Sequence, residues 1–168
     1  MSSMTASSSS KAPLESVVSS TQATPDSNAS ASTQAAALDQ AKPTGLVMQI
    51  ILRRDLVTSL GWPLGPMMAQ AAHAASAVQH RYADHVDMKR YLSGEDGRGW
   101  EVMRKAVLEV PDEAALQNLA AKLEAAGIPH HVWMEEPEHY PTALALVPNK
   151  RPKGLKRILD ESGCSLWK

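Results

Sequence analysis

One continuous apolar run strongly limits the folds open to this chain of 168 residues. Residues 46–52 read Leu-Val-Met-Gln-Ile-Ile-Leu, with branched side chains on successive positions rather than every second one. A run without alternation is typical of a strand that is buried on both faces of a sheet. We therefore expect residues 46–52 to form a central strand of an α/β fold.

Three charged residues follow this strand directly. Arg53, Arg54 and Asp55 would lie at its carboxyl end, the edge where open α/β sheets usually bind ligands. The alternative is a solvated strand end at which an arginine pairs with the aspartate. The pattern alone leaves both interpretations open.

An alanine-rich helix is predicted next. Gly and Pro punctuate residues 61–66, and the run from 66 to 82 contains no further helix breaker. Its small side chains allow close packing, and Gln70 and His73 lie next to each other on its surface. His73 is either a hydrogen-bonded core histidine or a group that titrates for chemistry.

The remaining pattern alternates helices and strands. Helices are predicted at 84–92, from 111 to the stop at Gly127, and at 154–161; further strands are predicted at 103–110, 128–135 and 142–147. In the third strand, His131, Trp133 and Glu135 share one face. The order β-α-α-β-α-β-β-α predicts a small three-layer α/β sandwich with a four-stranded mixed sheet.

The first 44 residues differ in composition from the rest. Ser, Ala, Thr, Gln and Pro dominate residues 1–44, which contain no aromatic residue. Such a segment cannot offset the entropy of ordering, so we expect a disordered tail before a single domain at 45–168. The tail has no Arg and carries Glu15, Asp26 and Asp39, which argues against mitochondrial import. The cytoplasm is the expected compartment, rather than an organelle such as the mitochondrion.

Several classes of function are disfavoured. The single Cys164 cannot form an internal disulfide and is expected to be inert, and no apolar run approaches the length of a membrane span. Gly61 and Gly65 lack the Lys-Ser/Thr of a phosphate-binding loop. His73 and His80 are seven residues apart rather than four, which disfavours a metal site. We expect no cofactor and no membrane association.

Bulk charge says little about partners, because the formal net charge is −1. One local basic patch stands out, and it could contact phosphates or form a solvated helix face. Its residues are Lys150, Arg151, Lys153, Lys156 and Arg157.

Taken together, four segments resemble the type 2 peptidyl-tRNA hydrolases, most closely their divergent peptidyl-tRNA hydrolase domain-containing branch. They are residues 53–56 (Arg-Arg-Asp-Leu), 69–75 (Ala-Gln-Ala-Ala-His-Ala-Ala), 107–116 and 162–167. The resemblance covers residues 46–168. It implies a hydrolase that cleaves the ester between a peptide and the 3′ ribose of tRNA in translation quality control, without a metal or organic cofactor.

The resemblance also implies roles for individual residues. His73, with Glu135 or Glu136, is a candidate general base, and Gln70 and Thr142 would position water or substrate. Asp55 matches the family's aspartate after the first strand. The residues implied for the tRNA phosphates are Arg53, Arg54, Lys150, Arg151 and Lys153.

This sequence departs from the family at two places. The family's Lys-Met-Gly-Lys-Gly-Lys loop is replaced by residues 62–66, Trp-Pro-Leu-Gly-Pro, and its Asp-Ala-Gly-x-Thr segment by residues 135–142. The missing lysines motivate a second hypothesis, a module that binds tRNA or a protein partner without turnover. The sequence also leaves a homodimer open.

Overall fold

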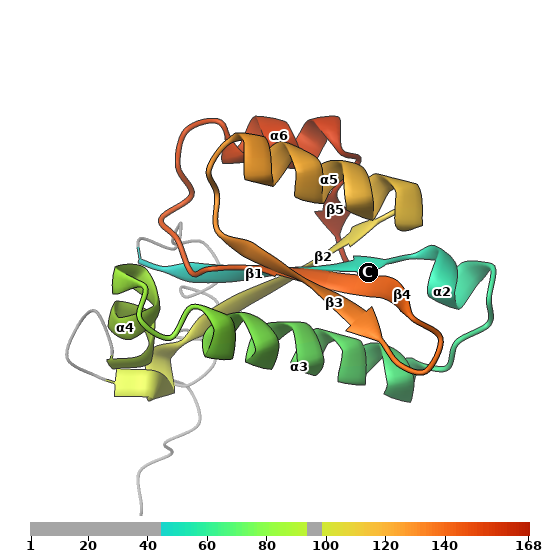
Figure 1. Ribbon diagram of the computed structural model, residues 1–168, viewed down its shortest axis with the longest axis horizontal. Helices are drawn as coiled ribbons and strands as arrows, with labels where there is room; N and C mark the ends of the chain where they lie inside the picture. The colour runs from blue at the N-terminus through green and yellow to red at the C-terminus, as the bar shows by residue number, and fades with distance from the viewer. Residues whose placement is uncertain (1–44, 94–98) are drawn as a thin grey trace, which may run out of the picture. The chain divides into compact units, whose positions relative to one another are not determined.

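The computed structural model describes residues 45–93 and 99–168. A five-stranded mixed sheet forms the middle of three layers, with strand order β3-β4-β1-β2-β5 (Figure 1). β1 is parallel to β2 and antiparallel to β4. The strands are β1 (Val47–Arg53), β2 (Arg104–Val110), β3 (His130–Glu135), β4 (Tyr140–Leu146) and β5 (Ser165–Leu166). The predicted tail at 1–44 lies outside the described residues.

Helices cover both faces of the sheet. Helices α3 and α4 lie on one face, and α5 and α6 lie on the other (Figure 1). The helices are α2 (Asp55–Thr58), α3 (Leu64–Arg81), α4 (Val86–Ser93), α5 (Glu113–Ala125) and α6 (Leu155–Glu161), with a short 3-10 helix η1 at Gly99–Val102. Among the described residues, no helix is long and apolar enough to cross a membrane.

The prediction of a central strand is confirmed. Every residue of β1 is buried, because its two faces contribute to two separate cores. Met48, Ile50 and Leu52 pack in the core beneath α3, whereas Ile51 packs in the core beneath α5. A strand between two apolar layers must be apolar on both faces, and this is what the unbroken run at 46–52 encodes.

The prediction of four strands is wrong by one. Ser165 and Leu166 form a fifth strand that pairs antiparallel with Leu108 and Glu109 of β2. Two residues cannot display an alternating pattern, so the strand gave no periodic signal; its pairing depends on tertiary contact with β2. The residues after β1 also differ from the prediction, because a helical turn, α2, precedes the expected loop.

Helix α5 begins and ends where its local sequence predicts. The Asp112 side chain accepts a hydrogen bond of 2.9 Å from the backbone N–H of Ala115, which caps the helix N-terminus. Gly127 follows the helix with a φ of 65°, a conformation that favours glycine. The helix therefore presents Leu116, Leu119 and Leu123, all fully buried, to the sheet.

The cap at Asp112 should contribute measurably to stability. Replacing Asp112 with Ala removes the acceptor for the Ala115 N–H, and the free energy of unfolding should fall by about 1 kcal/mol. Asp112→Asn keeps a capping oxygen and should lose much less. Urea denaturation of the three proteins measures the difference, and an equal loss in both variants would contradict a capping role.

Candidate functional site

Two predicted residues, Gln70 and Thr142, are in direct contact. Gln70 lies on the face of α3 toward the sheet and is 2% exposed, and Thr142 of β4 is fully buried. The Thr142 hydroxyl donates a hydrogen bond of 2.6 Å to Oε1 of Gln70. Because a buried amide without a partner is costly, this bond satisfies the carbonyl end of Gln70 and orients its side chain.

His73 forms the next part of the site. It lies three residues after Gln70 on α3 and is exposed, so the first of its two interpretations, a core histidine, is wrong. Its imidazole stacks on the indole of Trp133, with ring centroids 4.8 Å apart and planes 13° apart. A stack through the ring faces leaves the edge of the imidazole, which carries both nitrogens, uncovered by the indole.

A carboxylate is tied to this stack. The indole N–H of Trp133 donates a hydrogen bond of 2.9 Å to Oε2 of Glu135. Trp133 and Glu135 alternate to the same face of β3, the face that packs against α3. The structure thus places His73 and Glu135 against the same indole.

Arg53 lies at the end of β1, beside this site, and its charge is directed inward. Its side chain is 6% exposed, and its guanidinium donates to both carboxylate oxygens of Asp55, at 3.1 and 2.7 Å. It also donates to Glu113, at 2.8 Å, and to the carbonyl of Pro141, at 2.9 Å. Burial alone would lower the pKa of Arg53, but the two carboxylates outweigh it and raise that pKa. The Arg–Asp pair foreseen as an alternative is the arrangement found.

Aromatic side chains connect Arg53 to the loop before α3. The guanidinium of Arg53 lies over the ring of Tyr140, 5.4 Å from its centroid. Tyr140 in turn contacts Trp62, with ring centroids 6.2 Å apart. Trp62 belongs to residues 62–66, which replace the family's lysine-rich loop. In this chain an aromatic contact therefore takes the place of that loop's lysines.

The other predicted residues lie apart from His73. Glu136 is exposed in the turn after β3, where it pairs with His139 at 2.9 Å. Arg54 contacts Glu109 at 3.2 Å and lies over the ring of Trp167. Lys150, Arg151 and Lys153 are exposed beyond Asn149, which pairs with Val47 at the opposite end of β1 from Asp55. The predicted phosphate contacts therefore do not form one patch.

Three contributors to the site were not predicted: Trp133, Tyr140 and Glu113. The alternation of β3 already put Trp133 on the face of Glu135, but nothing in the sequence paired that face with His73. Glu113 lies at the start of α5. Its bond to Arg53 spans 60 positions of sequence, and such a long-range contact has no local signal.

Cys164 lies away from this site and should react slowly. Burial, together with the nearby Asp160 carboxylate, raises the pKa of its thiol to about 11. Because only the thiolate is nucleophilic, alkylation by iodoacetamide at pH 8 should be roughly 100-fold slower than in the urea-unfolded chain. Comparable rates for the folded and unfolded protein would contradict this prediction.

Among the described residues, no three His, Cys, Asp or Glu side chains are grouped to hold a metal ion.

Two curated proteins and one solved structure are similar to this chain. Human "Putative peptidyl-tRNA hydrolase PTRHD1" is 45% identical over 109 residues, which cover 64% of this chain and 74% of the human protein. The mouse protein of the same name is 44% identical over 108 residues, with the same coverage. A solved protein of unknown function from Agrobacterium tumefaciens strain C58 overlaps with 73% of this chain and 98% of its own, at a TM-score of 0.48 and 16% identity. That overlap is too weak to bear on function.

The family comparison covers both cores and every part of the site described above. The match to peptidyl-tRNA hydrolase PTH2 extends over residues 46–158, from β1 into α6. It includes α3 with Gln70 and His73, and strands β3 and β4 with their partners. The chain belongs to the peptidyl-tRNA hydrolase PTH2 family.

Proposed function

We propose that this protein hydrolyses the ester between the peptide and the 3′ ribose of peptidyl-tRNA, releasing free tRNA. Family membership suggests the reaction. The observation that carries the proposal to this chain is the stack of His73 on Trp133, whose indole also holds Glu135. That arrangement fixes the imidazole plane while leaving its nitrogens at an exposed ring edge.

In the proposed reaction, His73 acts as general base on water. One imidazole nitrogen takes a proton as the water oxygen forms a bond to the ester carbonyl carbon. The bond from that carbon to the ribose oxygen then breaks, and the imidazolium returns its proton to this oxygen. The products are a peptide carboxylic acid and the 3′-hydroxyl of tRNA, so no redox partner is required.

Glu135 and Gln70 have supporting roles in this proposal. The Glu135 carboxylate, which accepts from the indole N–H, supplies negative charge that stabilises the imidazolium formed on the face of the same ring. Gln70 uses Oε1 to accept from Thr142, and its side chain is only 2% exposed, so it supports His73 by holding α3 against β4 rather than by touching the substrate. Thr142 is fully buried, so it positions Gln70 rather than touching the substrate.

Binding of tRNA would depend on cations outside the stack. The Arg53 side chain is only 6% exposed and lies between two carboxylates, so we propose that the more exposed cations Arg54, Lys150 and Lys153 contact phosphates. Such contacts weaken as salt rises, because counterions compete for the same phosphates.

The decisive experiment measures release of peptide from peptidyl-tRNA. Purified full-length protein is incubated with N-acetylated aminoacyl-tRNA, and intact ester is separated from free tRNA over time. We expect turnover that EDTA leaves unchanged. A rate equal to that of spontaneous hydrolysis would reject the proposal.

A second candidate function is binding without turnover. It is favoured by one observation: Trp62 of the loop before α3 contacts Tyr140, in a segment where the resemblance leads one to expect lysines. Binding of tRNA that weakens steeply between 50 and 200 mM salt, without ester cleavage, would support this function over the hydrolase.

A further inference from the structure

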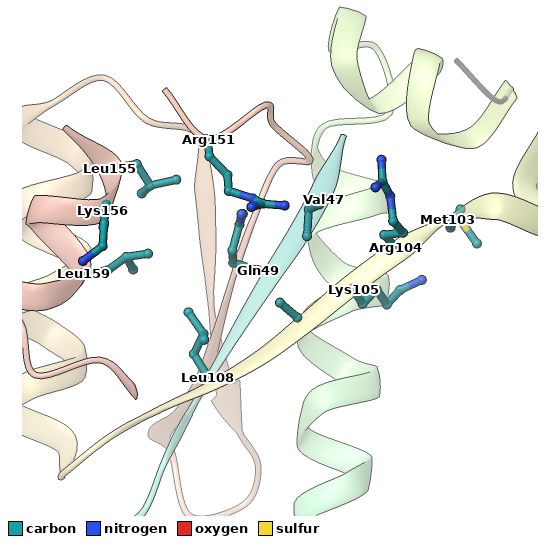
Figure 2. A pocket seen from close by; sticks show the side chains of 11 residues that line it. Val47, Gln49, Met103, Arg104, Lys105, Leu108, Arg151, Leu155, Lys156 and Leu159 are labelled. Carbon is teal, nitrogen blue, oxygen red and sulfur yellow. The ribbon is translucent and has the colours of Figure 1, made fainter. Parts of the chain in front are cut away.

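A groove separate from the His73 site lies between α6 and the first half of β2. Its volume is about 910 Å³, within the range of ligand sites. In Figure 2, β2 crosses in front of β1, and Leu155 and Leu159 of α6 form the left side of the groove. It reaches Val47, the amino end of β1, whereas the His73 site lies on the other face of the sheet, toward the carboxyl end of β1.

The groove runs beside a strand that is only partly covered. Within residues 45–93 and 99–168, β5 pairs with Leu108 and Glu109 of β2, and the backbone N–H of Trp167 donates to the carbonyl of Val107. Backbone groups alternate sides along a strand, so the N–H and C=O of Lys105 point to the same edge as those of Val107. β5 does not extend to Lys105, and an added strand could bond there.

The side chains of the groove are of two kinds. Leu108, Leu155 and Leu159 give it an aliphatic floor, and Arg151 extends across it toward Gln49 (Figure 2). Arg104 and Lys156 add positive charge at its margins, where Lys156 also pairs with Asp160. Among the residues that the structure describes, no acidic residue lines it. The groove therefore complements a ligand that alternates aliphatic and acidic groups, because one set can be buried while the other meets the cations.

We propose that this groove binds an extended acidic peptide segment of a protein partner, which adds to β2 at Lys105 and places aliphatic side chains over Leu108 and Leu159. A strand edge recognises the peptide backbone, the leucines recognise alternate side chains, and the cations select negative charge. RNA fits these features less well, because the described part of the lining has no aromatic ring on which a base could stack. The inference is independent of the hydrolase proposal.

The test uses a blocked octapeptide of alternating glutamate and valine with a fluorescent label. Binding to the full chain is followed by fluorescence anisotropy, and the contacted residues by amide chemical shifts. We expect shifts at Lys105 and Val107 and none at Gln70 or His73. Arg104→Glu should weaken binding by at least about fivefold. Lys89→Glu, the same charge change on α4, should leave binding unchanged.

Controls on the peptide avoid any effect on folding. A peptide with the same side chains but N-methylated amides cannot add as a strand, and one with lysine in place of glutamate has the wrong charge; both should bind at least about tenfold more weakly. Equal binding of either peptide would overturn the proposal. Displacement of the probe by tRNA or by decanoate at lower concentration would also overturn it, in favour of a nucleic-acid or small-anion site.

Discussion

Replacing His73 with Ala should lower kcat/KM for peptidyl-tRNA by at least about 100-fold, the scale of a lost general base. The histidine lies on the surface of α3 and contacts the rest of the fold through its stack on Trp133. Stability should therefore change little, and the loss should appear in catalysis. The measurement is initial-rate kinetics on N-acetylated aminoacyl-tRNA, with urea denaturation of the same samples.

Two further variants separate proton transfer from stacking. His73→Phe keeps an aromatic ring against Trp133 but has no nitrogen, so it should be as inactive as His73→Ala. His80→Ala removes another exposed histidine from the same helix, seven residues on, and should keep wild-type activity. Recovery of activity in His73→Phe would show that the ring supports the site without taking a proton.

The largest effect on stability is expected at Arg53. Arg53→Met should lower the free energy of unfolding by about 3 kcal/mol, because it leaves Asp55 and Glu113 facing each other without their shared cation. The guanidinium also joins the end of β1 to α5 and to β4 through Glu113 and the Pro141 carbonyl. Removing the guanidinium should loosen the contact between the end of β1 and the start of β4, where Thr142 orients Gln70. Urea denaturation monitored by circular dichroism measures the loss.

The adjacent arginine provides the matched control. Arg54→Met removes the same charge one residue later, but the Arg54 side chain is 35% exposed, against 6% for Arg53. Solvent screens its pair with Glu109, so the loss should be under about 1 kcal/mol. Similar losses in the two variants would mean that the network around Arg53 contributes no more than a surface pair.

The order of elements was largely predictable because each long element carries its own local signal. The apolar run of β1, the capping aspartate before α5 and the glycine after it mark elements that the structure confirms. Strand β5 was missed, since two residues have no period. The buried face of α3 was also hard to predict, because alanines are compatible with both packing and exposure. The structure buries Met67, Gln70 and Val78 and exposes His73.

Some residues of the candidate site could be named from the sequence, but their arrangement could not. His73, Gln70, Thr142 and Glu135 were named from the resemblance, yet only the packing of α3 on β3 and β4 brings them together. The same packing separates Lys150 and Lys153 from them, since those residues follow β4 at the far end of β1.

By itself the sequence determined the central strand, the α/β class and the family, because hydrophobic pattern, capping and motif spacing are local properties of the chain. Tertiary structure alone decided which way the charged and aromatic side chains face. Arg53 turns inward because two carboxylates from different elements meet it there, and His73 is oriented because Trp133 of a distant strand lies against it. The contacts of Arg53 with Glu113 and of His73 with Trp133 each join residues that are 60 positions apart, and they exist only once the layers have packed.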